Sequence, residues 1–250
     1  MPAAHQERPR RRQSEVRTID SSAGAAAIIP IRRGCPSATL TIAGRSVLDG
    51  TIRALRAVSA IGPIVLALEG IDRASCLSAV ERPEDLDLLV TEAMPTRWLA
   101  IEAAMDLAGD ASYVVVHEPD RPLILATWLS GVLRDLNGIE AALAAVPAHD
   151  TIKRVSGTQI VGTLPRETLH VSQAPWIFER DVLARAVRQA ISGGWQARHE
   201  LELARRAGIR LQLIEGHRFN QPIASATDAR YAEITRRVQA ALLGTPAAAS

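Results

Sequence analysis

The sequence is poor in lysine, cysteine and aromatic residues, and each shortage excludes a class of function. Lys153 is the only lysine in the 250-residue chain, so chemistry that needs two ammonium groups has no second donor. Cys35 and Cys76 are too few for a disulfide framework or a thiolate zinc site. Their scarcity favours a reducing compartment, and we expect a cytoplasmic protein. Aromatic residues make up 3% of the chain, so Ala, Leu, Ile and Val must build its core.

A strong excess of one charge is also missing, because the formal net charge is +2. No global field therefore points to a nucleic-acid or membrane partner. No apolar run approaches the roughly 20 residues of a membrane-spanning helix. The apolar fraction of 47% and the charged fraction of 22% are typical of a folded globular chain.

The two ends differ in composition from the rest of the chain. Residues 1–22 contain five arginines without apolar periodicity, which predicts a disordered basic tail. The apolar stretch that follows is short and predicts a buried strand rather than a signal peptide. We expect residues 23–244 to form a single domain and residues 245–250 to form another tail.

Short β-like runs alternate with helical patterns over the first 139 residues. This alternation needs crossover connections, so it predicts an α/β fold with a doubly wound, mostly parallel, Rossmann-like sheet and helices on both faces. The predicted strands are 25–31, 62–69, 85–91 and 112–118, and the predicted helices are 47–58, 72–80, 96–108 and 122–136, the last with Pro122 in its first turn.

The pattern changes after residue 139. Three β-like pieces within 150–175 predict an antiparallel β-arm that leaves the main sheet. Helical periodicity returns at 180–191 and 198–208. A strand at 209–215 and a helix at 227–242 complete the expected fold.

Polar motifs follow two predicted strands, at the ends where doubly wound sheets bind ligands. His117 and Glu118 offer either a metal site or a structural pair that caps a helix and holds Arg121. Arg32 and Arg33 offer either an anion site or a solvated loop.

The predicted arm carries a polar motif of its own. Asp150, Thr151 and Lys153 either bind phosphate or form a structural turn with a solvated lysine. Arg166 is either a phosphate ligand or an exposed arginine of the arm.

Five segments follow one another along the chain: AAIIPI, LTIAGRSVLDGTIRAL, VVVHEPDRPLI, HDTIKRV and TLPRETLHVSQAPWIF. In this order they resemble the 2-C-methyl-D-erythritol 4-phosphate cytidylyltransferase family of the non-mevalonate isoprenoid pathway. The resemblance covers roughly residues 25–240 and includes the chain's last predicted strand and helix, so it implies a nucleotidyltransferase-like domain. It also implies a homodimer embraced through the arm, and cytidylyl transfer from CTP to a small phosphorylated alcohol with Mg²⁺.

The resemblance also implies roles for charged and polar residues at the strand ends and on the arm. The nucleotide would be bound by Arg97, Arg121, Arg32 and Arg33, the acceptor phosphate by Arg166, Thr151, Asp150 and Lys153, and the metal by Glu118 and Asp120.

The chain departs from the family pattern at groups that bind phosphate or stabilise developing charge. The Gly-rich loop after the first strand is shortened and keeps Gly34 alone. Ser37 and Pro222 stand where the family has its two lysines. Ala174 replaces a threonine at the substrate phosphate, and Ala100 replaces a serine that faces the cytidine. These losses predict weak cytidylyltransferase activity or, alternatively, a non-catalytic paralogue that acts as a dimeric binding or scaffold protein.

Overall fold

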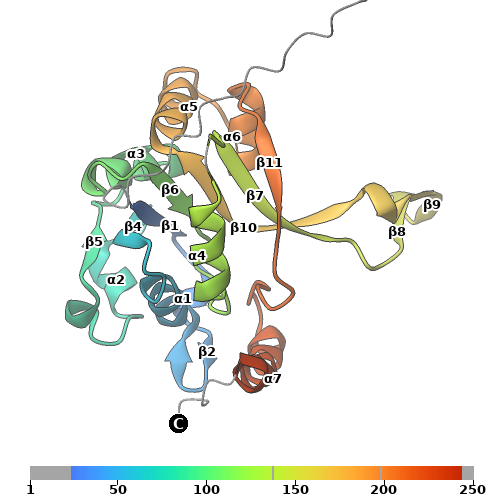
Figure 1. Cartoon of the computed structure of the whole chain (residues 1–250), viewed down its shortest axis with the longest axis horizontal. Helices are drawn as coiled ribbons and strands as arrows, with labels where there is room; N and C mark the ends of the chain where they lie inside the picture. Colours follow the sequence, from blue (N-terminus) through green and yellow to red (C-terminus); the bar gives the residue numbers. More distant parts are fainter. Residues whose placement is uncertain (1–23, 137, 198, 244–250) are drawn as a thin grey trace, which may run out of the picture.

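The computed structural model describes residues 24–136, 138–197 and 199–243, and a seven-stranded sheet runs through its centre (Figure 1). The strands are β1 (Ala25–Arg32), β4 (Ile61–Glu69), β5 (Leu88–Val90), β6 (Tyr113–Val116), β7 (Ala141–Pro147), β10 (His170–Glu179) and β11 (Leu211–Glu215). Their order across the sheet is β11-β7-β10-β6-β1-β4-β5. Among these seven, β10 alone runs antiparallel to its neighbours, which confirms the predicted doubly wound, mostly parallel sheet.

Helices cover both faces of the sheet. They are α1 (Val47–Arg56), α2 (Arg73–Leu77), α3 (Arg97–Leu107), α4 (Ala126–Arg134), α5 (Arg180–Ser192), α6 (Glu200–Arg206) and α7 (Ala226–Leu243). Side chains of α1, α2 and α4 pack on one face, and those of α3, α5 and α6 pack on the other. Both core clusters consist mainly of Ala, Leu, Ile and Val, as the scarcity of aromatic residues requires.

Local sequence signals set several helix ends. At the start of α1, Ser46 Oγ accepts a hydrogen bond from Asp49 N at 3.0 Å. Thr96 Oγ1 does the same for Leu99 N at the start of α3, at 3.4 Å. Gly208 follows α6 with a φ of +69°, the left-handed conformation in which glycine carries no steric penalty. Local residues therefore fix these helix ends.

The predicted β-arm is present. A hairpin of β8 (Ile152–Ser156) and β9 (Gln159–Leu164) projects from the body of the molecule, beyond the ends of β7 and β10 (Figure 1). The arm expected at 150–175 is not wholly separate from the sheet, because β10 returns to pair with β6 and β7. Val161 and Val171 are exposed on the arm.

Two predicted elements need correction, and one strand is not predicted. Helix α4 begins at Ala126, four residues after Pro122, so this proline lies in the preceding turn. The strand expected at 85–91 is shorter, because a 3-10 turn occupies Pro83–Leu86 before β5. The sequence pattern does not predict β7, since its AALAAVP run is poor in β-branched residues. Pairing with β10 and β11 makes this segment a strand.

Helix α7 packs away from the main sheet, against the short hairpin of β2 (Thr41–Ile42) and β3 (Arg45–Ser46) (Figure 1). Ala43 N in the hairpin turn donates to Glu233 Oε1 of α7 at 2.9 Å. None of the helices within the described ranges combines the length and apolar character that crossing a membrane requires. The tails expected at 1–22 and 245–250 lie outside the described residues. The small core cluster under α7 consists of Ile42, Val47, Leu123, Ile223, Ala229 and Ala232.

Candidate functional site

The carboxyl ends of β1, β4, β6 and β7 meet at one edge of the sheet, because these strands share one direction. Doubly wound sheets bind ligands at this edge. Arg97 at the start of α3 and Glu200 at the start of α6 reach the same place as Glu118, which follows β6. The candidate site therefore combines a strand end with two helix starts.

Arg97 lies between two carboxylates and joins these three elements. Its Nε and Nη2 donate to Glu200 Oε1 at 3.1 and 2.7 Å, and Nη2 also donates to Glu118 Oε1 at 3.1 Å. The side chain of Glu200 is completely buried, and that of Arg97 is 16% exposed. Burial alone would lower the pKa of Arg97, but attraction to the two carboxylates outweighs it and raises that pKa. Burial raises the pKa of Glu118, and attraction to Arg97 opposes this rise.

His117 connects the end of β6 to the segment that follows it, through a contact with a backbone carbonyl. Its ring is fully buried, Nε2 lies 3.1 Å from Arg121 O, and burial lowers its pKa to about 4, so the imidazole is neutral. Arg121 Nη1 donates to Asn220 O at 2.6 Å, and Asn220 Nδ2 donates to Ala174 O. This chain of contacts ties the end of β6 to β10 and to the segment after β11.

Buried polar atoms without partners gather at the same edge. An unsatisfied buried polar group costs about 1–3 kcal/mol, so a concentration of them marks a place where a ligand, ion or water can bind. Burial raises the pKa of Asp120 and lowers that of Arg121. The atoms in question are His117 Nδ1, Asp120 Oδ1, Arg121 Nε, Glu200 Oε2 and Asn220 Oδ1.

The segment after β1 offers little phosphate-binding capacity. Arg33 Nε donates to Gly70 O at 2.7 Å and so ties this turn to the end of β4. Ser37 is fully buried, and its Oγ lies 3.0 Å from Cys35 Sγ. Arg32 is exposed at the end of β1. An anion at this edge would therefore meet Arg32 more readily than Arg33.

The polar residues of the arm form a second group. Lys153 Nζ donates to Thr163 Oγ1 across the hairpin at 2.8 Å, and Arg166 Nη1 donates to His149 O at 2.8 Å. Asp150 and Thr151 are exposed just before β8. Among the described residues, no hydrogen bond or ion pair connects this group to the Arg97 cluster.

Glu118 and Asp120 supply the carboxylates expected to bind Mg²⁺. No three His, Cys, Asp or Glu side chains within the described ranges come together as a complete metal site. Mg²⁺ is usually bound by one or two carboxylates together with substrate phosphates, so a full protein cage is not required. The buried, unpartnered Oδ1 of Asp120 fits a metal that arrives with a nucleotide.

A cavity of about 360 Å³ opens beside Arg97 and includes Glu69, Thr96 and Trp195 in its lining. Its volume lies at the lower end of the range for small-molecule pockets. The sequence analysis assigns neither Glu69 nor Glu200 to a site. Acidic residues are common in the first turn of a helix, so Glu200 gives no distinct signal before its contact with Arg97, 103 residues away, is seen.

The family described as 2-C-methyl-D-erythritol 4-phosphate cytidylyltransferase matches residues 22–237. The chain belongs to this family. A cytidylyltransferase of that name from Symbiobacterium thermophilum is 32% identical over 198 residues, which cover 78% of this chain and 82% of the relative. Another, from Solibacter usitatus, is 29% identical over 208 residues, with 81% and 85% of the two chains covered.

Solved structures agree with membership of the cytidylyltransferase family. The crystal structure of 2-C-methyl-D-erythritol 4-phosphate cytidylyltransferase from Thermus thermophilus matches with a TM-score of 0.71 and 25% identity, over 85% of this chain and 99% of that one. A CMP:2-keto-3-deoxy-manno-octonic acid synthetase complexed with CTP shares the fold, with a TM-score of 0.62 and 16% identity. These similarities show that the chain shares the fold of the solved cytidylyltransferase over most of its length.

Proposed function

We propose that this chain binds CTP at the carboxyl ends of β1, β4 and β6 and has a strongly reduced capacity for cytidylyl transfer. The observation that carries this proposal is the cluster of Arg97, Glu118 and Glu200, with unpartnered buried polar atoms beside it. An edge built only for stability would leave fewer such atoms unsatisfied. Family membership supports CTP as the nucleotide.

The proposed roles at this edge follow from charge and position. Arg121 and Arg32 attract the phosphates, with Arg33 fixing the turn after β1. Arg97 is held by its two carboxylates and shapes the nucleotide side of the site. Glu118 and Asp120 would hold Mg²⁺, which neutralises charge on a triphosphate when bound.

The arm supplies the proposed acceptor site in a homodimer. Asp150, Thr151, Lys153 and Arg166 would bind the phosphate of the acceptor alcohol, and exposed apolar residues of the arm would pack against the partner. Light scattering at micromolar concentration is expected to give twice the 26.9 kDa of one chain. A mass of one chain would contradict the dimer. We also propose that residues 23–244 form one domain. The scarcity of cysteine supports a cytoplasmic location.

A second candidate is a non-catalytic paralogue that binds partners or ligands as a dimer. Three observations favour it: Ser37 is buried and uncharged, Pro222 lines a hollow with α7, and Ala174 offers only its backbone to Asn220. Removal of a single transition-state donor costs roughly 10²–10³ in rate, so the combined losses leave little turnover.

The decisive measurement is pyrophosphate release with CTP, 2-C-methyl-D-erythritol 4-phosphate and Mg²⁺, beside calorimetric titration of CTP. We expect CTP binding with turnover far below the usual enzyme range of about 1–10³ s⁻¹. Ser37→Lys should restore little activity, because the shortened loop still lacks donors and such groups do not act additively. Binding without any turnover would favour the second candidate. Turnover within the usual range would contradict both, and no CTP binding would refute the nucleotide site.

A further inference from the structure

Helix α7 presents its larger apolar side chains to solvent and its small ones to the protein. Ala229 and Ala232 are buried against the β2–β3 hairpin region. Tyr231, Ile234 and Leu242 are 65%, 59% and 72% exposed. A surface helix normally turns its bulky apolar side toward the core, so this arrangement is reversed.

The exposed residues form a continuous stripe with the spacing of a helix-pairing seam. Tyr231, Ile234, Val238 and Ala241 follow one another in steps of three, four and three along the 18-residue helix, and all four are exposed. This spacing places the four side chains on one face of α7, where the side chains of a second helix can pack between them. We call these four residues and Leu242 the α7 stripe.

Two arginines define the charge of the stripe. Arg230 and Arg237 are exposed, lie seven residues apart and follow one edge of it. Neither takes part in an ion pair among the described residues. A helix that packs on the stripe would set its own flanking residues against these guanidinium groups, so acidic residues there would be favoured.

A hollow of about 70 Å³ lies beside Tyr231, next to Phe219 and Pro222. It provides room for a side chain of a partner at one end of the stripe. At protein interfaces, an apolar side chain contributes most to affinity when it fills a pocket that removes it from water.

A second copy of this chain fits the stripe poorly. Antiparallel pairing of two α7 helices would set Arg230 against Arg237 of the other copy. Parallel pairing would set Arg230 against Thr235, with no acid to match. The exposed arm is also a poor occupant, because it is a β-hairpin whose basic residues, Lys153, Arg154 and Arg166, outnumber its acids, Asp150 and Glu167.

We propose that the α7 stripe is a docking surface for an amphipathic helix of another protein, whose apolar face packs on Tyr231, Ile234 and Val238 and whose acidic edge faces Arg230 and Arg237. No residue of the α7 stripe belongs to the set proposed above to bind CTP or the acceptor. The partner's recognition chemistry is an apolar seam flanked by Glu or Asp.

Fluorescence anisotropy of the full chain with two synthetic helical peptides tests this proposal. Both peptides carry leucine along the seam, and their flanking positions are all glutamate in one and all lysine in the other. We expect the glutamate peptide to bind at least tenfold more tightly. Ile234→Glu with Val238→Glu should reduce its affinity at least tenfold. Arg230→Glu with Arg237→Glu should reverse the preference toward the lysine peptide.

The matched control is Leu107→Glu with Leu213→Glu on α3 and β11, which replaces two exposed apolar residues away from both the stripe and the arm. It should leave peptide affinity unchanged. Equal binding of both peptides, or no effect of the arginine reversal, would overturn the proposal. So would a lower solution mass for Ile234→Glu with Val238→Glu, because a second copy would then cover the stripe. Loss of binding to phosphatidylglycerol vesicles in that variant, without peptide binding by the wild type, would assign the surface to a membrane.

Discussion

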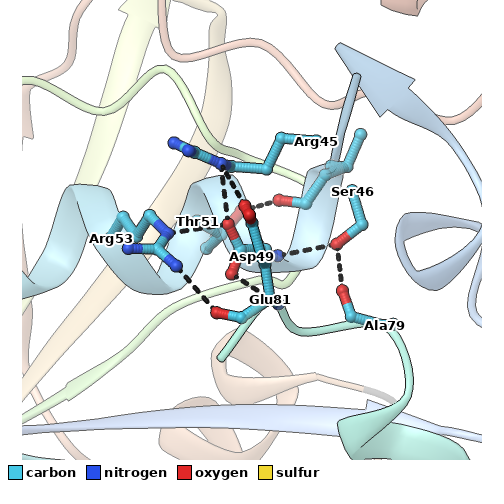
Figure 2. Close-up of polar contacts among 8 residues, drawn as sticks. Arg45, Ser46, Asp49, Thr51, Arg53, Ala79 and Glu81 are labelled. Carbon is cyan, nitrogen blue, oxygen red and sulfur yellow. Dashed lines mark hydrogen bonds and ion pairs between the residues drawn. The ribbon is translucent and has the colours of Figure 1, made fainter. Parts of the chain in front are cut away.

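Two fully buried carboxylates with arginine partners lie in different parts of this molecule and differ in how completely they are satisfied. Asp49 of α1 accepts from Arg53 Nε through Oδ2 at 2.8 Å, and the same oxygen forms an ion pair with Arg45 Nε at 3.0 Å (Figure 2). Its Oδ1 accepts from Glu81 N at 3.1 Å, so both oxygens have donors. Glu200 at the strand ends uses Oε1 for Arg97, while Oε2 is buried without a partner.

The difference distinguishes a structural network from a binding site. Around Asp49, Ser46 Oγ also bonds Ala79 O, and Arg53 Nη2 bonds Glu81 O at 2.8 Å, so the network closes on itself (Figure 2). It fastens the turn at 79–81 to the start of α1. Around Glu200, the neighbouring Asp120 and His117 also have unpartnered buried atoms. Closed networks contribute stability, and incompletely satisfied ones keep hydrogen-bonding capacity for a ligand.

The largest expected effect concerns acid and the strand-end region. Burial lowers the pKa of His117 to about 4, so the folded state binds this proton less readily than the unfolded state. Above pH 6.5 this shift has no effect on the free energy of unfolding. As the pH falls below 6.5, the free energy of unfolding decreases, and the decrease reaches about 3 kcal/mol at pH 4. The raised pKa values of Glu118 and Asp120 act in the opposite direction. Denaturant unfolding between pH 4 and 7 should therefore show a flatter curve for His117→Gln than for the wild type. Parallel curves would contradict this.

Asp49→Ala should lower the free energy of unfolding by about 2–3 kcal/mol, because it removes a buried carboxylate and leaves the Glu81 backbone N–H, Arg45 and Arg53 without their acceptor. CTP affinity should not change, since the network closes away from the strand ends. Urea titration measures the first effect and calorimetry the second. Asp106→Ala, at an exposed site on α3, is the control and should stay within about 0.5 kcal/mol of the wild type.

Glu200→Gln should lower CTP affinity more than stability, in contrast to Asp49→Ala. It keeps the shape of the side chain and removes the charge that fixes Arg97, so we expect CTP affinity to fall about tenfold, or about 1.4 kcal/mol. The loss of stability should be smaller than for Asp49→Ala. Glu84→Gln, at an exposed position, should change neither quantity. A Glu200→Gln protein that loses stability but keeps its CTP affinity would make this cluster structural, like that of Asp49.

The smallest effect is expected from removal of the N-terminal arginines. A chain that starts at Ser22 should melt within a few degrees of the full chain, because residues 1–21 have no core-forming pattern. Differential scanning calorimetry of both proteins measures this. A drop of ten degrees or more would show that the N-terminal segment packs on the folded body.

Much of the fold follows from local patterns in the sequence. Uninterrupted apolar runs define β1, β4 and β6, because strands buried on both faces carry no polar alternation. Helices α1 and α3 start at Ser46 and Thr96, whose side chains satisfy free backbone N–H groups. Strand β7 cannot be predicted in this way, because its alanines have little strand preference. Pairing with β10 and β11 makes this segment a strand.

The features of the candidate site also fall into those that the sequence sets and those that the tertiary structure sets. The sequence alone determines which charges are available: arginines at Arg32, Arg97 and Arg121, one lysine on the arm, and no lysine at either family position. Only the tertiary structure brings Glu200 to Arg97 and leaves its second oxygen without a partner. Only packing turns Ala229 and Ala232 of α7 inward and its larger apolar residues outward. Residue type is a local property, whereas burial and pairing depend on segments far apart in the chain, so they are decided when the sheet and its helices assemble.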